Sequence, residues 1–513
     1  MKKIILSAAF ALITFCASAA FGDIFSEMYL NYLVMDDDAS TDYPKVWVIG
    51  PSSAGSTQPN LSLSIPTAVT HDGVTYRVTQ IDAKAFSGRT NIVQAFIGYG
   101  ITHIGNEAFK GCSKLVNVRI PSSIQSIGDN AFASCSALKE VNIANDDPST
   151  FTTSASAFPS NSDMTLGVAK TNDLRTVTAF NNLSQYSKFA TIELSSAAYD
   201  FTTDDSFAMC VTKAPSKNVP GEVKLVGVFG NSTGAFAPKA TYTHSVYSYK
   251  LVATGFRSCK DQTQIKSFDF SNATNLKTID CYTFSGCTNL TSVNLGSTVD
   301  QIELYAFENV PISSITIPKS VSYIGYLAFN KCPNLSAISV DSNNPFYKSS
   351  YGVLYMYLKG DKWDLVCCPA AFPYTAFYEY MFPSQVTVID CNAFAFCTNL
   401  KTIHIPYGVQ KLKDYLFNAA LQEVKIPGSV SEFDADAFGN ASGLQRIFIN
   451  ITTPPTIKLF PATPANLYVP YGFVSNYKSA AFWKNCVNIQ EGSYDVPEAC
   501  TQTVSGTLLN DVR

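Results

Sequence analysis

Hydrophobic residues recur along this chain at a nearly constant spacing and form one repeated motif. Its clearest copy runs from Ile101 to Pro121 as Ile-x-x-Ile-Gly-x-x-Ala-Phe-x-x-Cys-x-x-Leu-x-x-Val-x-Ile-Pro. The anchoring phenylalanines form three runs: Phe86, Phe109 and Phe132; Phe256, Phe284, Phe307 and Phe329; and Phe394, Phe417 and Phe438. The steps within the runs are 23 and 23, then 28, 23 and 22, then 23 and 21 residues. A period in the low twenties predicts a solenoid, in which each unit buries its apolar side chains against the next unit.

Within one repeat the polar and apolar residues alternate over a short segment. Val118 and Ile120 are apolar, whereas Asn117 and Arg119 between them are polar, and Pro121 follows. This period of two predicts one half-buried strand per repeat, ended by the proline. The rest of each repeat is expected to form a tight arc, short and helical or irregular. The predicted fold is therefore a β-rich solenoid of parallel stacked strands.

The motif is interrupted between Phe132 and Phe256, and the interruption predicts two tandem solenoids with β caps. The segment from Phe158 to Tyr186 resembles the segment from Phe460 to Ile489, so both are interpreted as closing caps. Tyrosine-rich β segments precede each run of repeats. Because terminal caps seal a solenoid, a cap in mid-chain marks a boundary. We expect a signal peptide at 1–22, a first solenoid at 23–193, a second at 194–490 and a tail at 491–513.

The step from Phe329 to Phe394 is 65 residues, which predicts an insert at 341–390. This insert is rich in tyrosine, and Gly352 and Gly360 are expected to form the turns of an added hairpin. Tyr355, Tyr357 and Trp363 are candidate ligand anchors, because such side chains pair a large apolar area with a polar tip. Alternatively, these rings fill the core of the hairpin itself.

The N-terminus predicts export. Lys2 and Lys3 precede the apolar stretch Ile4 to Cys16, and small residues follow, as in a cleaved signal peptide. A lipidated Cys16 is the less favoured alternative. The net charge of −4 gives no basic surface for nucleic acid, and no apolar run of the sequence is long enough for a membrane-spanning helix.

The chain has 14 cysteines, which in an exported protein usually indicates disulfides. Six of them, however, stand three residues after an anchoring Phe, where other repeats place mostly small apolar residues. We therefore expect mainly buried free thiols, with some oxidised pairs as the alternative. Cys367, Cys368, Cys486 and Cys500 are the strongest candidates for disulfides.

The recurring Ile-Gly-x-x-Ala-Phe-x-x-Cys and Ile-Pro segments resemble the BspA-like leucine-rich-repeat family, strongly over about 75–145 and 250–450. The insert resembles the widened repeat of that family through Asn344-Pro345 and Gly352-Val353-Leu354-Tyr355. The resemblance implies a leucine-rich-repeat solenoid and an exported, surface-associated bacterial or mucosal protein that acts in adhesion. It transfers no ligand residue to a numbered position.

The outward residues of the predicted strands are the main candidate binding surface. Period-two counting predicts that they form one continuous polar face suited to broad recognition of a protein or glycan. The candidates are Asn117, Arg119, Glu140, Asn142, Asn294, Thr316, His404, Glu423, Lys425, Arg446 and Phe448. Their polarity serves equally well to keep a half-exposed sheet soluble. His404 is expected to face solvent.

The sequence contains no recognised nucleophile motif, phosphate-binding glycine loop or spaced metal-ligand set, so we predict no enzyme activity, cofactor or metal. The leading hypothesis is a secreted or cell-surface binding protein of adhesin type with an extracellular protein or glycan partner. The alternative hypothesis is a structural, self-associating component of the cell envelope.

Overall fold

The computed structural model describes residues 21–36, 43–161, 163–170, 175–195, 197–230, 233–458 and 466–492, without the side chain of Arg175. The predicted signal peptide lies outside this range except for its last two residues, and the predicted tail lies outside it after residue 492. The chain divides into two compact units. Unit 1 comprises Met1–Phe229 with Thr241–Leu251, and unit 2 comprises Gly230–Ala240 with Val252–Arg513. The predicted boundary between the two solenoids at residue 194 stays a prediction. Unit 1 extends past this residue and includes 195–229 and Thr241–Leu251.

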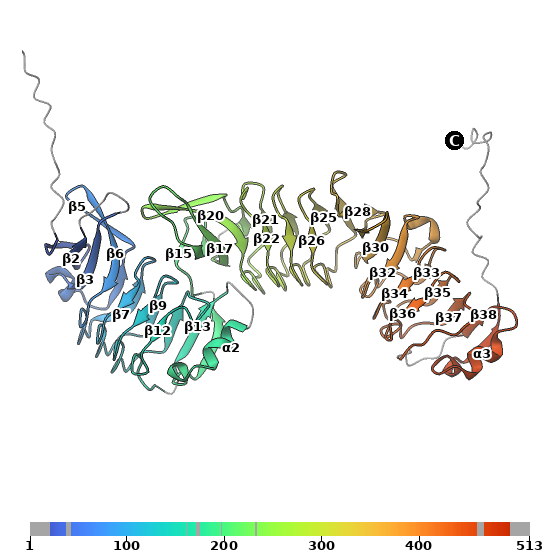
Figure 1. Cartoon of the computed structure of the whole chain (residues 1–513), viewed down its shortest axis with the longest axis horizontal. Coiled ribbons are helices and arrows are strands. Elements are labelled where there is room, and N and C mark those ends of the chain that lie inside the picture. The colour runs from blue at the N-terminus through green and yellow to red at the C-terminus, as the bar shows by residue number, and fades with distance from the viewer. Residues whose placement is uncertain are drawn as a thin grey trace, which may run out of the picture. The chain divides into compact units, whose positions relative to one another are not determined.

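The stacked parallel repeats of the predicted solenoid are confirmed, but each repeat contributes two strands instead of one (Figure 1). The longer strand comes from the Val-x-Ile segment, as in β9 (Asn117–Ile120) and β11 (Glu140–Ile143), which pair in parallel. The shorter strand comes from the Ile-Gly segment, as in β8 (His103–Ile104) and β10 (Ser126–Ile127). The prediction of one strand was wrong because a two-residue strand is too short to show alternation.

Unit 1 combines two sheets that extend along its repeats. The first has the order β1 (Ile24–Glu27), β2 (Leu30–Asp36), β3 (Lys45–Pro51), β6 (Val74–Ile81), β8, β10 and β12 (Thr152–Thr153), with β5 (Ala68–His71) paired to β6. The second has the order β14 (Thr191–Ser195), β13 (Thr165–Ala169), β11, β9, β7 (Ile92–Ile97) and β4 (Leu61–Ile65). The helical segments of this unit are α1 (Ser53–Thr57), α2 (Arg175–Asn181) and η1 (Ser184–Tyr186).

A second cap repeats the strand plan of the first. It contains β15 (Phe201–Thr202), β16 (Phe207–Lys213), β17 (Gly221–Val228), β19 (Thr241–His244) and β20 (Tyr247–Thr254). The order β15-β16-β17-β20, with β19 paired to β20, matches β1-β2-β3-β6, with β5 paired to β6. The two closing caps also match, since each passes from a strand through a short helix and a 3-10 turn to a parallel strand. These matches support an internal duplication of the chain.

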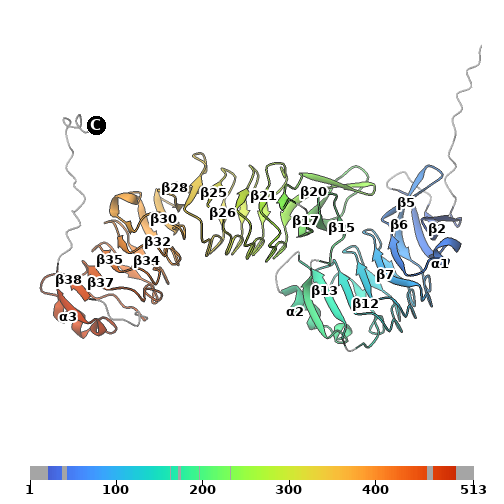
Figure 2. The same cartoon turned by 180° about the vertical axis from the view of Figure 1, so that it is seen from behind.

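Unit 2 carries several shorter sheets, seen from behind in Figure 2. On one side lie β22 (Thr278–Ile279), β24 (Gln301–Ile302) and β26 (Tyr323–Ile324), then β28 (Tyr347–Ser350), β29 (Val353–Leu358), β30 (Lys362–Cys367), β32 (Val386–Ile389), β34 (Lys411–Leu412) and β36 (Glu432–Phe433). On the other side lie β18 (Ala235–Phe236), β21 (Ser267–Asp269) and β23 (Ser292–Asn294), and the pair β25 (Ser314–Ile317) and β27 (Ala337–Val340). The last sheet comprises β31 (Ala376–Phe377), β33 (Thr402–His404), β35 (Glu423–Ile426), β37 (Arg446–Ile449), β38 (Asn466–Val469) and β39 (Asn488–Glu491). The helical segments are η2 (Glu379–Met381), α3 (Val474–Ser479) and η3 (Trp483–Asn485).

The insert forms the predicted hairpin turns. Strand β28 pairs antiparallel with β29, and β29 pairs antiparallel with β30. Gly352 and Gly360 occupy the two turns with φ of +78° and +82°, a backbone region that glycine enters without steric cost.

The anchoring phenylalanines form the dry spine of the solenoids. All ten rings are buried, with at most 5% of any residue exposed. The Phe86, Phe109 and Phe132 rings stack at centroid distances of 5.0 and 5.1 Å, and Phe284, Phe307 and Phe329 follow at 5.4 and 5.7 Å. One ring per repeat thus fills the interior at a constant height.

The predicted buried thiols are confirmed: the twelve cysteines within the described residues are free, Cys367, Cys368 and Cys486 included. Cys16 and Cys500 lie outside the described residues. The slot three residues after an anchoring Phe holds a thiol that donates to a carbonyl of the preceding repeat, as from Cys112 Sγ to Phe86 O at 3.2 Å and from Cys332 Sγ to Phe307 O at 3.0 Å. Burial raises the pKa of Cys287 to about 12, so this thiol stays protonated.

Candidate functional site

The last sheet of unit 2 brings aromatic and charged side chains into one row. His404 on β33 is in register with Lys425 on β35, Lys425 with Phe448 on β37, and Phe448 with Tyr468 on β38. Tyr378 directly follows β31 and contacts His404. We call Tyr378, His404, Lys425, Phe448 and Tyr468 the aromatic row. Parallel pairing of equivalent repeat positions produces it, because each strand adds one side chain at the same height.

Direct contacts connect most of the aromatic row. The Tyr378 and His404 rings meet edge to face at 4.9 Å, and the Phe448 and Tyr468 rings stack at 4.3 Å. The Lys425 ammonium lies 5.5 Å from the Phe448 ring centre, within the range of a cation–π contact. At one end, Tyr380 stacks on Tyr378 at 5.8 Å and is 72% exposed. The row therefore presents flat apolar faces beside a cation.

Charged side chains flank the aromatic row. His404 Nδ1 lies 3.4 Å from Glu379 and Nε2 lies 3.4 Å from Glu423, while Arg446 Nε donates to Glu423 at 2.7 Å. Burial and the neighbouring Lys425 lower the pKa of His404, against the effect of both carboxylates. Burial opposes ionisation of Glu423, but Arg446 and His404 hold its pKa below the ordinary value. The Glu423 carboxylate thus holds the side chains of His404 and Arg446 in place on this sheet.

The predicted exposure of His404 was wrong. Its side chain is only 13% exposed, because Tyr378, Glu379 and Glu423 surround the ring. Period-two counting places the side chain on the correct face but does not show which loop residues cover it.

Arg119, a candidate in unit 1, is held by the chain that follows the first closing cap. Its guanidinium lies 3.7 Å from the Tyr199 ring centre and 4.8 Å from that of Phe96, and its Nε donates to Ala197 O at 3.0 Å. Nearby, Asp200 accepts hydrogen bonds from the backbone and hydroxyl of Ser122, each at 2.7 Å. These contacts fasten the second cap to the face of β9.

The other unit 1 candidates bond to one another. Asn117 Nδ2 donates to Glu140 Oε2 at 2.6 Å, and Asn142 Nδ2 donates to Glu140 Oε1 at 2.8 Å. Asn142 is 1% exposed, so its predicted outward exposure was wrong. Strand β13 leaves no room over this amide, since a Cβ on Gly167 would lie 2.3 Å from Asn142 Oδ1.

Asn294 and Thr316 are exposed on β23 and β25, as expected. The prediction of one continuous face was wrong, however, because β23 and β25 belong to different sheets and the insert separates β27 from β31. Strand β23 ends at Asn294, and the chain turns two residues later at Gly296, which has φ of +69°.

The aromatic candidates of the insert divide into buried and exposed rings. Tyr355 is fully buried, so its predicted role as an exposed anchor was wrong, and it fills the core as the alternative interpretation had it. Tyr357 is 42% exposed and meets Trp363 edge to face at 5.1 Å. The Lys348 ammonium lies 3.7 Å from the Trp363 ring centre.

Sequence reasoning missed Tyr378, Tyr380 and Tyr468 as neighbours of the candidate residues. The sequence could have predicted the position of Tyr468, because Leu467-Tyr468-Val469-Pro470 follows the same strand and proline pattern as the repeats. Tyr378 and Tyr380 lie in the insert region, where the period gives no register.

In the part of the chain that the structure describes, no three His, Cys, Asp or Glu side chains form a group able to hold a metal ion. No helix within the same residues combines the length and apolar character needed to cross a membrane.

Comparisons with known proteins identify the family. No curated protein sequence matches this chain significantly. The crystal structure of a leucine-rich cell surface protein from Faecalibacterium prausnitzii is similar to this chain, with 18% sequence identity and a TM-score of 0.36. The alignment covers 92% of this chain and 96% of that protein. A leucine-rich repeat protein from Bacteroides ovatus is 21% identical, with a TM-score of 0.34 and coverage of 83% of this chain and 94% of that one. The model of the BspA type leucine rich repeat region matches residues 72–187, 255–351 and 368–459, and the chain therefore belongs to the BspA-type leucine-rich-repeat family.

Proposed function

We propose that this chain is a non-catalytic, secreted or cell-surface binding protein of adhesin type, and that it recognises an extracellular protein or glycan of a host or another microbe through the aromatic row. Family membership supports a binding role. The row itself carries the proposal, because it aligns five side chains across neighbouring strands, leaves Tyr378 exposed and continues at that end into the exposed ring of Tyr380.

The chemistry of the row suits extended, shallow recognition. Aromatic faces contribute large contact area with little loss of conformational freedom, and hot spots of interfaces are enriched in tyrosine and arginine. Arg446 has a 46% exposed side chain, and the half-buried Glu423 carboxylate beside it orients the guanidinium. A sugar ring or a peptide side chain stacked on the aromatic row would contact the Arg446 guanidinium beside the row.

Binding of the full chain to glycan and matrix-protein arrays tests the proposal. Lys425→Ala with Tyr468→Ala should reduce the affinity for any ligand found by at least about tenfold, the loss typical of removing one hot-spot side chain. Tyr471→Ala is the matched control, because this tyrosine is 68% exposed but lies in the turn after β38, outside the row. Equal binding by the double variant and the wild type would refute the assignment to the row.

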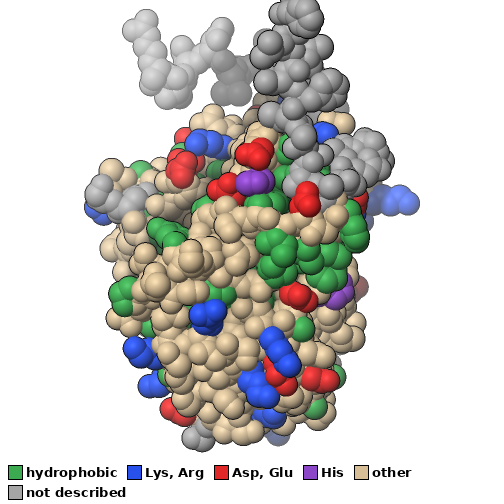
Figure 3. All heavy atoms as spheres, turned by 90° about the vertical axis from the view of Figure 1, so that its left-hand side faces the viewer, with side chains coloured by type: hydrophobic (Ala, Val, Ile, Leu, Met, Phe, Trp, Pro, Cys, Tyr) green, Lys and Arg blue, Asp and Glu red, His purple; other side chains and the backbone are tan. Residues whose placement is uncertain are grey.

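One observation favours self-association as a second candidate function. Strand β1 is an edge strand of the first sheet; Ile24 on this strand is 63% exposed, and Met28 in the turn that follows it is 65% exposed. Figure 3 views this end of unit 1, where apolar side chains lie among charged ones. Exposed apolar edge strands are templates for pairing with a second chain.

Analytical ultracentrifugation over a range of concentrations separates the two functions. Self-association predicts a concentration-dependent mass that Ile24→Lys with Met28→Lys abolishes. A monomer at all concentrations contradicts self-association and leaves ligand binding as the function.

A further inference from the structure

A polar cleft of unit 1 lies where the second cap meets the second sheet of that unit. Its volume is about 420 Å³, and its lining includes Ser64, Phe96, Arg119, Thr202 and His244. We call it the Arg119 cleft. Its walls come from the ends of β4 and β7, from β9, from β15 and from the turn between β19 and β20, all within unit 1.

One edge of the Arg119 guanidinium remains available to a ligand in the cleft. The rings of Phe96 and Tyr199 lie over the guanidinium, and Nε on one edge donates to Ala197 O. Within the described residues, no carbonyl or carboxylate accepts a hydrogen bond from Nη1 or Nη2, and neither atom is among the buried polar atoms that lack a partner. Because Arg119 is only half-buried, these two nitrogens keep accessible surface.

The charge of Arg119 has no carboxylate partner. Glu140 attracts the guanidinium from a distance, but its oxygens accept hydrogen bonds from two asparagines. Asp200 lines the cleft, but its oxygens accept three hydrogen bonds from Ser122 and from the Val211 N–H. No Asp or Glu of the described residues forms an ion pair with Arg119. A cation withdrawn from water is costly unless it is paired, so the cleft favours an anion.

Comparison with the first cap shows that the second cap lacks a carboxylate at this place. His71 and His244 are equivalent, because each ends a hairpin strand of its cap and stacks on a phenylalanine, at 4.3 and 4.4 Å. In the first cap the next residue is Asp72, whose carboxylate lies 3.6 Å from His71. In the second cap the same turn position holds Ser245, which lines the cleft. The second cap therefore offers an anion a hydroxyl where the first has a negative charge.

Hydroxyl groups and the available space indicate what kind of anion fits. Ser64, Thr202 and Ser245 line the cleft and are exposed, and each hydroxyl can donate and accept, as the hydroxyls of a sugar do. A cavity of about 150 Å³ in another protein accommodates benzene, so this larger cleft has room for a substituted six-membered ring. A planar carboxylate matches the two terminal N–H donors of a guanidinium and balances its single charge.

We propose that the Arg119 cleft binds a six-membered sugar ring that carries one carboxylate, such as glucuronate. The carboxylate pairs with Nη1 and Nη2 of Arg119, and the ring hydroxyls bond to Ser64, Thr202 and Ser245. The cleft belongs to unit 1 and the aromatic row to unit 2, so either proposal can fail without the other.

Ligand-observed NMR titration of the full chain with glucuronate, glucose and acetate tests the class of ligand. Glucose keeps the ring without the charge, and acetate keeps the charge without the ring. We expect glucuronate to bind at least about tenfold more tightly than either, since a hydrogen bond to a charged group contributes that much. Equal affinity for glucuronate and glucose would overturn the pairing with Arg119. Equal affinity for glucuronate and acetate would overturn the sugar.

Ser245→Asp tests the position of the site. The new carboxylate should weaken glucuronate binding by at least about tenfold through repulsion and leave glucose binding unchanged. The turn accommodates it, because Asp72 has φ of +47° at the equivalent position, where Ser245 has +55°. Ser245→Asn is the matched control, since it is uncharged, has the size of Asp and also tolerates positive φ.

Equal glucuronate affinity of the two Ser245 variants would overturn the proposal, and so would no binding of glucuronate to the wild type at millimolar concentrations. Thermal melting of each variant verifies folding. Because Ser245 is exposed, this pair leaves the Arg119 contacts that hold the second cap intact.

Discussion

Asp364 makes the stability of the insert depend on pH in a direction opposite to that of most carboxylates. It lies on β30 with 3% of its side chain exposed, and its Oδ1 has no hydrogen-bond partner within the described residues. Its Oδ2 is 3.5 Å from Lys413 Nζ, which is closer to Asp390, at 2.8 Å. Burial, and then the charge of Asp390, raises the pKa of Asp364 from 3.8 to about 7, against the attraction of Lys413.

The sign follows from linkage between protonation and folding. Because the folded pKa lies above the unfolded value, the fold favours the protonated carboxyl, and this stabilisation is complete below about pH 4 and is lost as the pH rises to about 7. Each tenfold change in the protonation equilibrium is worth about 1.36 kcal/mol, so ionisation of Asp364 costs up to about 4 kcal/mol. Asp364→Asn keeps the size and stays neutral.

We expect Asp364→Asn to gain stability over the wild type by about 1.4 kcal/mol per pH unit between about pH 4 and pH 7, and little more above it. Urea unfolding followed by tryptophan fluorescence measures this, since Trp363 adjoins Asp364. Asp361→Asn is the control, because Asp361 is exposed in the turn of the same hairpin. Parallel curves for Asp364→Asn and the wild type across this range would refute the argument.

Three further substitutions test the packing of the repeats. Phe109→Ala should cost about 3–5 kcal/mol of unfolding free energy, because it opens a cavity between two stacked rings, and chemical denaturation measures the loss. Lys84→Asn should stabilise by about 0.5–1 kcal/mol and Lys84→Val should destabilise, since Lys84 is exposed with φ of +60°; equal melting temperatures would contradict this. Arg119→Ala should increase hydrogen exchange of β15 and β16 relative to Lys114→Ala, an exposed lysine of the same repeat, because Arg119 fastens the second cap to β9; unchanged protection would show that this contact is dispensable.

The prediction for Lys84 rests on a backbone conformation that recurs in the repeats and that the sequence alone did not indicate. The residue two positions before the anchoring Phe has positive φ in most repeats, as at Glu107, Asn130, Tyr305 and Asn392. None of these residues is β-branched, which agrees with the steric cost of a branched side chain there. Thr254 is the one β-branched residue at this position in the ten repeats, and its φ is not positive. Such a scarcity of β-branched residues at one position is a weak signal, and the hydrophobic period conceals it.

The candidate residues divide according to what covers them. His404, Glu423, Lys425, Arg446 and Phe448 lie together on one sheet, and their proximity follows from the repeat register. Whether they bind a ligand stays a prediction. Asn142 and Tyr355 occupy the expected strands but are buried, because period two assigns a face and not an exposed surface.

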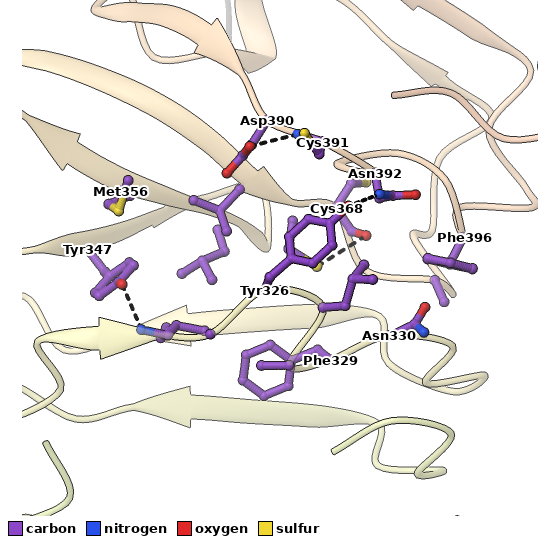
Figure 4. Close-up of a pocket in the computed structure, with 18 of the residues that line it drawn as sticks. Tyr326, Phe329, Asn330, Tyr347, Met356, Cys368, Asp390, Cys391, Asn392 and Phe396 are labelled. Carbon is purple, nitrogen blue, oxygen red and sulfur yellow. Dashed lines mark hydrogen bonds between the residues drawn. The ribbon is translucent and has the colours of Figure 1, made fainter. Parts of the chain in front are cut away.

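The sequence by itself determined the stacked repeats, the phenylalanine spine and the thiol slots, because these arise from contacts between equivalent positions of adjacent repeats. It also indicated the duplicated caps, since the same segments recur in the same order. Only the tertiary structure decided which polar positions remain accessible. Arg119 is held by Ala197, 78 residues later, and the Tyr326 hydroxyl accepts a hydrogen bond from Asn392, 66 residues later (Figure 4). Such contacts join segments that no period relates, so they depend on how the chain packs after the repeats have formed.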